Sequence, residues 1–177
     1  MNLFTGESAD EFFGGDVSPL LRDLLHRAQQ APAAERSALL WTAQSCAPQT
    51  LAVYYLLYKH HAARREFELA EKAALRGLDV AASQAGLPGD AVFLEFELPA
   101  LPEGLDFMAP GPARFWLFTQ KALAFIALRS DRPAESRRRL ALIERLAPAS
   151  GVGSDVIAAL LDSTDPGAQA GSGTQAQ

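Results

Sequence analysis

The stretch LAVYYLLYKHHAARREFELAEKAALRGLDVAAS, residues 51–83, decides the fold class. Its first eight residues are apolar on nearly all sides, as in a helix packed between other helices. Val53, Tyr54 and Tyr55 would also suit a β-strand, but the run continues into residues that favour helix. A turn near residues 64–66 would divide it into two antiparallel helices. The second helix carries one apolar face, formed by Phe67, Ala70, Ala74, Leu75 and Leu78. The stretch therefore predicts a helical hairpin and an all-α protein.

Helix start and stop signals extend this pattern in both directions. Ser18 and Pro19 supply a cap and a proline at the first helical position, and Pro32 and Pro48 bound a second helix over 33–46. Towards the C-terminus the signals predict helices from about 113 to 129 and from 133 to 148. A last short helix is expected in VIAALLD, residues 156–162. These helices would form one further hairpin on each side of residues 51–83.

Composition excludes several classes of protein. The chain has 177 residues, 49% hydrophobic and 21% charged, which fits one folding unit with a buried core. Its net charge of −5 argues against a nucleic-acid binder. The first residues do not form a secretory signal, and no long uncharged apolar stretch predicts a membrane span. The single cysteine, Cys46, excludes an internal disulfide. We therefore expect a cytoplasmic protein in which Cys46 is buried and inert.

The predicted domain organisation has three parts. Residues 1–17 form a flexible acidic N-terminal segment, residues 18–162 a helical domain, and residues 163–177 a disordered tail. The N-terminal segment carries Phe4, Phe12 and Phe13, which would dock on a partner or, as we prefer, on the first helix of the protein itself.

A proline-rich insertion interrupts the helical domain at about residues 86–112. It holds five prolines, five acidic residues and no Lys or Arg, and alternation in AVFLEFEL, residues 91–98, suits a short extended piece. Its charge leads to the hypothesis that it lies across a basic part of the helical domain, or occupies its groove. In the groove it would compete with a partner.

A repeat relates the first two hairpins. Leu40 and Ala74, Ala43 and Gly77, and Pro48 and Ala82 are each 34 residues apart. The pattern resembles the tetratricopeptide repeat. The match is best over residues 51–83, at Tyr54, Leu57, His61, Phe67, Ala70, Gly77 and Leu78. The resemblance implies a right-handed stack of antiparallel helical hairpins with a C-terminal capping helix, VIAALLD. A plain helical bundle is the alternative.

The resemblance also implies a concave groove that binds a protein or peptide. The family's groove positions fall on Arg22, Leu25, Tyr55, Lys59, Lys121, Phe125 and Arg129. Four of these residues are basic, so we expect an acidic segment or a terminal carboxylate as the ligand. The family's carboxylate clamp uses asparagines that this chain lacks, because Asn2 is its only asparagine. In the competing interpretation Tyr55 and Phe125 are core residues and the lysines are ordinary solvated side chains.

Three functions remain from the sequence. We favour a non-enzymatic adaptor or chaperone-like scaffold of bacterial type that binds another protein through the groove. The second is a structural or assembly factor that uses the insertion, through Phe93, Phe96 and Phe107, as its interface. The third is a helical enzyme of unknown chemistry.

No residue pattern predicts a catalytic group, a cofactor or a metal site. His60 and His61 are adjacent, so on a helix they point about 100° apart and do not easily share a metal. Arg137, Arg138 and Arg139 span too wide an arc for one basic stripe, and we expect them on a solvated face.

Overall fold

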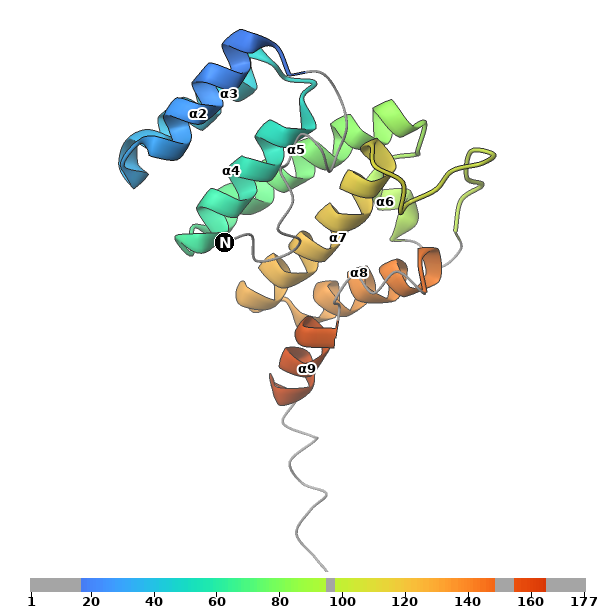
Figure 1. Cartoon of the computed structure of the whole chain (residues 1–177). Helices are drawn as coiled ribbons and strands as arrows, with labels where there is room; N and C mark the ends of the chain where they lie inside the picture. The colour runs from blue at the N-terminus through green and yellow to red at the C-terminus, as the bar shows by residue number, and fades with distance from the viewer. Residues whose placement is uncertain (1–16, 95–97, 149–154, 165–177) are drawn as a thin grey trace, which may run out of the picture.

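The computed structural model describes residues 17–94, 98–148 and 155–164 (Figure 1). Within these residues the chain forms eight helices and no strand, which confirms the all-α prediction. The acidic segment up to residue 16, Phe96 and the end of the chain after residue 164 lie outside the described residues. The helices are α2 (Pro19–Gln30), α3 (Ala33–Cys46), α4 (Leu51–Ala63), α5 (Phe67–Ala85), α6 (Asp90–Phe93), α7 (Pro112–Arg129), α8 (Pro133–Leu146) and α9 (Asp155–Thr164).

Most helix boundaries lie where the local signals predict them. Proline occupies the first turn of α2, α7 and α8, and the Ser18 hydroxyl accepts a hydrogen bond from the Leu21 backbone N–H at 3.3 Å. Gly86 ends α5 in the left-handed conformation, with φ of 66°, which costs glycine little. Local chemistry therefore determines where these helices begin and end.

Each helix packs mainly on its neighbours along the chain. α2 packs on α3, α4 on α5 and α7 on α8, while α3 contacts α4 and α5 contacts α7 across the insertion. α9 contacts both α7 and α8 (Figure 1). None of the described helices combines the length and the apolar character that a membrane crossing requires.

α5 approaches both α4 and α7 closely at Gly77. A Cβ atom at this position would lie 2.7 Å from the Cβ of Tyr54 and 3.0 Å from Cζ of Phe115. The absence of a side chain therefore lets three helices approach one another closely.

The insertion is anchored by aromatic packing and contains a short helix, α6. Phe93 and Phe107 are buried, and their ring centroids lie 4.5 Å and 6.0 Å from that of Trp116 on α7. The expected extended piece over 91–98 is wrong at its start, because residues 90–93 form a helical turn that carries Phe93 into the core. Residues 95–97 of that piece lie outside the described residues.

A polar network ties the insertion to α7 and α8. Arg139 is buried, and its guanidinium donates to the Asp90 carboxylate at 3.2–3.3 Å, to Glu135 Oε1 at 3.1 Å and to Gln120 Oε1 at 2.5 Å. Gln120 Nε2 donates to Asp90 Oδ1 at 2.6 Å. The insertion thus pairs with a basic residue of the helical domain, as its charge suggested. The expectation of a solvated Arg139 is wrong, because Asp90 and Glu135 compensate its buried charge; Arg137 and Arg138 are exposed.

Cys46 is exposed, so the prediction of a buried thiol is wrong. α3 packs through a stripe of Leu40, Ala43 and Ala47, spaced three and four residues apart. Cys46 lies one position before Ala47 and is turned away from that stripe.

Candidate partner-binding site

The two predicted groove residues of α4, Tyr55 and Lys59, contact each other. Lys59 Nζ donates a hydrogen bond to the Tyr55 hydroxyl at 3.2 Å and lies 4.8 Å from the centre of the Tyr55 ring. Burial raises the pKa of Tyr55 and lowers the pKa of Lys59. The Lys59 ammonium is thus partly removed from water and held against an aromatic ring.

Tyr58 contacts both Tyr55 on α4 and the Thr119 side chain of α7. Its ring meets the Tyr55 ring edge-on, with centroids 5.5 Å apart. Burial raises the pKa of Tyr58 strongly, the charge of Tyr55 raises it further, and the nearby Thr119 side chain of α7 lowers it in part. α4 and α7 contact each other, and the contact of Tyr58 with Thr119 joins the two helices near Tyr55.

α7 presents a stripe in which cations alternate with rings. Arg114, Phe118, Lys121, Phe125 and Arg129 follow one another at intervals of three or four residues, so they share one side of the helix. The Arg114 guanidinium lies 5.7 Å from the Phe118 ring centre. The Arg129 guanidinium lies 5.9 Å from the ring of Phe67, at the start of α5. We call Tyr55, Lys59 and these five α7 residues the α4–α7 surface.

Exposure varies along the α4–α7 surface. Tyr55 and Lys121 are 9% and 8% exposed, Lys59 and Phe125 are half-buried, and Arg129 is exposed. Phe125 packs beside Ile157 and Leu161 of α9. The competing interpretation places Tyr55 and Phe125 in the core, and their burial agrees with it in part. It also expects Lys121 to be solvated, whereas Lys121 is buried.

The two predicted groove residues of the first hairpin do not belong to this surface. Leu25 is a core residue of α2, packed within the main hydrophobic cluster. Arg22 is exposed, and its guanidinium donates to the Val17 carbonyl at 3.1 Å. Leu25 is thus turned inward, and the assignment of Arg22 as a groove residue stays a prediction.

Two of the three phenylalanines of the alternative interface on the insertion are buried in the structure. Phe93 is 1% exposed and Phe107 is 6% exposed, because both pack on Trp116. Neither ring is offered to a partner; Phe96 lies outside the described residues.

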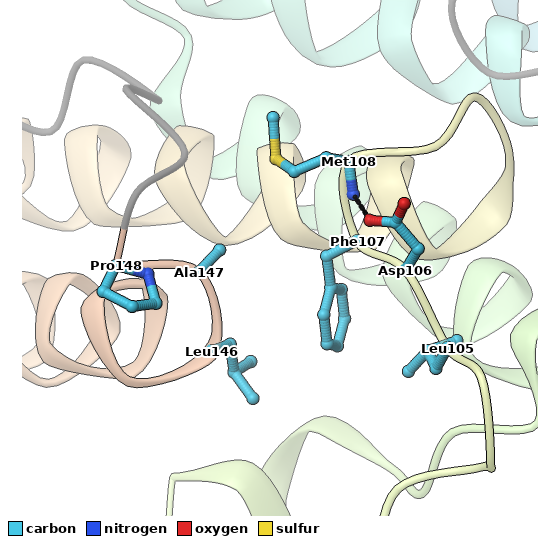
Figure 2. Close-up of a pocket in the computed structure, with 7 residues that line it drawn as sticks. All are labelled: Leu105, Asp106, Phe107, Met108, Leu146, Ala147 and Pro148. Atoms are coloured by element: carbon cyan, nitrogen blue, oxygen red, sulfur yellow. Dashed lines mark hydrogen bonds between the residues drawn. The ribbon is translucent and has the colours of Figure 1, made fainter.

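A pocket of about 370 Å³ lies between the end of the insertion and the end of α8 (Figure 2). Phe107 and Leu146 point into the same space, and Leu105, Met108, Ala147 and Pro148 add apolar walls. The Asp106 carboxylate accepts a hydrogen bond from the Met108 backbone N–H at 2.7 Å. Six of the seven side chains that line the pocket are apolar, and the carboxylate of the seventh, Asp106, binds the backbone of its own loop through one oxygen.

His61 lies between an acid and a hydroxyl at the turn from α4 to α5. Its Nδ1 lies 2.7 Å from Glu66 Oε2, and its Nε2 lies 3.5 Å from the Ser37 hydroxyl. The order of the three groups is that of a hydrolase triad. His61 is fully buried, however, and the Glu66 backbone N–H donates to the His61 carbonyl at 2.9 Å. The group therefore closes the turn between two helices.

Comparison with known proteins gives no match to a family model, a curated protein sequence or a solved structure.

Arg114 and Phe118 are members of the α4–α7 surface that the sequence analysis did not identify. They repeat, about two turns earlier on the helix, the cation–ring spacing of Lys121 and Phe125. The periodicity of residues 114–129 was the signal that could have found them. Among the described residues, no three His, Cys, Asp or Glu side chains gather as metal ligands.

Proposed function

We propose that this protein binds an acidic, ring-bearing segment of another protein at the α4–α7 surface and acts as a non-enzymatic adaptor or chaperone-like scaffold. One observation carries the proposal: the Lys59 ammonium is held against the Tyr55 ring on α4, and α4 contacts α7, the helix that carries the cation–ring stripe.

The chemistry of the α4–α7 surface selects such a ligand. Burial lowers the pKa of Lys59, and a carboxylate is the ligand group that best matches a partly desolvated lysine and the exposed Arg129. Phe118 and Phe125 offer half-buried ring area for an apolar side chain of the ligand. Cations and rings in alternation therefore suit a segment in which acids alternate with aromatic residues.

The order of helix contacts supports the proposed architecture. Consecutive hairpins pack on each other through α3 with α4 and through α5 with α7. We infer a right-handed, tetratricopeptide-like stack in which α4 and α7 are the inner helices of the second and third hairpins and α9 is the cap. In such a stack the inner helices border one concave face, which is where the α4–α7 surface would lie.

A peptide-binding measurement tests the proposal. We would titrate a fluorescently labelled peptide of alternating Glu, Asp and Phe residues with the full chain and follow its anisotropy. The double variant Lys59→Glu/Arg129→Glu places repulsive charges on the surface at half-buried and exposed positions, and is expected to weaken binding at least about tenfold. Equal affinity of the variant and the natural chain would overturn the proposal.

A matched control separates an effect at the α4–α7 surface from a general effect of the changed net charge. Lys72→Glu/Arg138→Glu makes the same change in charge at exposed positions of α5 and α8. It is expected to leave the affinity within about twofold. Circular dichroism of both variants checks that helicity is retained. Capture from a cell lysate with the same pair of variants then identifies the partner as the protein that only the site variant loses.

A further inference from the structure

We propose that the pocket between the insertion and the end of α8 binds a small hydrophobic ammonium ion, a cation that carries a compact hydrocarbon or aromatic body. Residues 105–108 of the insertion and residues 146–148 at the end of α8 form its walls (Figure 2). The pocket shares no residue with the α4–α7 surface, so the inference does not depend on the proposed function.

The pocket has the size and the lining of a small-ligand site. Its volume of about 370 Å³ lies at the lower end of the range of about 300–1,000 Å³ that is typical of such sites. Six of its seven lining side chains are apolar, and Phe107 and Leu146 point into the same space (Figure 2). Met108 is 37% exposed, so solvent reaches this part of the wall. The body of the ligand should therefore be apolar and small.

Both walls are held in place by the rest of the fold. On the insertion side, the ring centroid of Phe107 lies 6.0 Å from that of the buried Trp116 on α7. On the other side, the Ala147 backbone N–H donates to the Ile143 carbonyl of α8 at 2.9 Å. A pocket that is already formed needs little ordering when a ligand binds, which favours the affinity.

The side-chain charge of the pocket selects a cation. Asp106 is the one charged residue among the residues that line it. Asp106 Oδ1 accepts the Met108 backbone N–H at 2.7 Å, and no described side chain forms an ion pair with this carboxylate. Oδ2 is therefore available to accept a charge-assisted hydrogen bond from an ammonium group.

The end of α8 adds a second negative feature. Pro148 has no N–H, so it cannot satisfy the Glu144 carbonyl as Ala147 satisfies that of Ile143. The carboxyl end of a helix carries partial negative charge and attracts cations. Arg145, the basic residue of this last turn, is exposed and does not line the pocket. Asp106 and the helix end together disfavour an anionic ligand.

An NMR titration of the full chain tests the location of the ligand. The probe is 2-phenylethylammonium, and 2-phenylethanol is the reference of similar shape without the charge. The chain contains two methionines, so ¹³C-methyl labelling of methionine gives two signals, and Met108→Leu assigns the one from the pocket. The expected result is a saturable shift of the Met108 signal. A Met108 signal that does not move at concentrations of the ammonium probe up to about 10 mM would overturn the proposal.

Asp106→Asn tests the choice of a cation. The asparagine oxygen still accepts the Met108 N–H but carries no charge, so the affinity for the ammonium probe should fall at least about threefold and that for the alcohol by less than about twofold. Glu103→Gln neutralises an exposed residue of the same loop outside the lining and should leave both affinities within about twofold. Equal affinity of the natural chain for the two probes, or equal losses in the two variants, would refute the choice.

Met108→Lys tests the pocket itself. The variant places an ammonium group of the chain at the pocket, so ligand-observed NMR should show binding of the ammonium probe weakened at least about tenfold. Leu101→Lys is the matched control, because Leu101 is 38% exposed, lies in the same loop and does not line the pocket. It should change the affinity by less than about twofold. Circular dichroism checks the helicity of both variants, and equal losses in both would show that the net charge, not the pocket, governs binding.

Discussion

Asp90 and Arg139 form an ion pair across 49 positions of the chain, with Asp90 Oδ2 lying 3.2 Å from Arg139 Nη2. The Arg139 side chain is 4% exposed and the Asp90 side chain 14% exposed, so water screens this pair poorly. Asp90 lies at the start of α6 and Arg139 in the middle of α8. The pair therefore fastens the insertion to the last described hairpin.

Removing the charge of Asp90 should destabilise the protein. Asp90→Asn leaves the buried Arg139 guanidinium with Glu135 as its remaining carboxylate, and breaking a buried pair in this way costs about 3 kcal/mol. Urea denaturation of the variant and the natural chain measures this difference. Glu144→Gln, at an exposed position of the same helix α8, is the control and should change the free energy of unfolding little. A loss below about 1 kcal/mol for Asp90→Asn would contradict the network.

Phe93→Ala should release the insertion from the core. Phe93 is 1% exposed and packs against Trp116, so its truncation leaves a cavity and costs about 3–5 kcal/mol. With Trp41→Phe as background, Trp116 is the only tryptophan, and its fluorescence should shift to the red as water reaches the ring. Val92→Ala, at a half-exposed neighbouring position, is expected to change neither the emission nor the stability. An unshifted spectrum in Phe93→Ala would show that the ring does not shield Trp116.

Gly77→Ala tests the three-helix contact. Alanine normally favours a helix by about 1 kcal/mol over glycine, but here its Cβ would meet the Cβ of Tyr54 at 2.7 Å. A Cβ atom cannot rotate away, so α4 and α5 must separate, at a cost of about 1–3 kcal/mol. Thermal unfolding measures the effect. Gly89→Ala is the matched control, because no heavy atom lies within 4 Å of its added Cβ. Stabilisation by Gly77→Ala would contradict the close packing.

His60 should make the protein less stable as the pH falls. Burial lowers the pKa of His60 below its usual 6.5, the charges of His61, Arg36 and Arg64 lower it further, and Glu66 partly opposes them. The unfolded chain then binds more protons than the folded chain near that pH, so stability rises with pH across this range. The Nε2 atom of His60 is buried and has no hydrogen-bond partner among the described residues.

The test compares the natural chain with His60→Gln. Denaturation midpoints between about pH 7.5 and pH 5.5 should fall less in the variant, because one group that disfavours folding on protonation is gone. His26→Gln, at an exposed position of α2, is the control for loss of a histidine. A slope against pH that is identical in His60→Gln and the natural chain would refute the assignment.

The helices were predictable because their signals are local. Pro19, Pro112 and Pro133 mark helix starts, and Gly86 marks an end, whatever the rest of the chain does. α6 was missed, since a single helical turn among prolines and glycines has no periodicity to detect. The burial of Arg139 was missed because its compensating partner, Asp90, is distant in sequence.

Only those parts of the candidate site that lie on the second and third hairpins were predictable from the sequence. Tyr55 and Lys59 are one turn apart on α4, so their contact follows from helical spacing, and the same spacing puts Lys121 and Phe125 on one side of α7. The burial of Leu25 was missed because the sequence does not show which side of α2 meets α3. Arg114 and Phe118 were left out because the family's groove positions start later on that helix.

The contact between α5 and α7 makes the covalent link between them dispensable. Residues 100–104 are exposed, and the helices on either side of them are joined by Gly77 against Phe115 and by Asp90 with Arg139. A protease nick in this loop would leave two polypeptides that stay associated. Tyr55 and Lys59 would then reside on one polypeptide and Lys121 and Phe125 on the other, so the two halves produced separately would regain the complete surface only on reassociation.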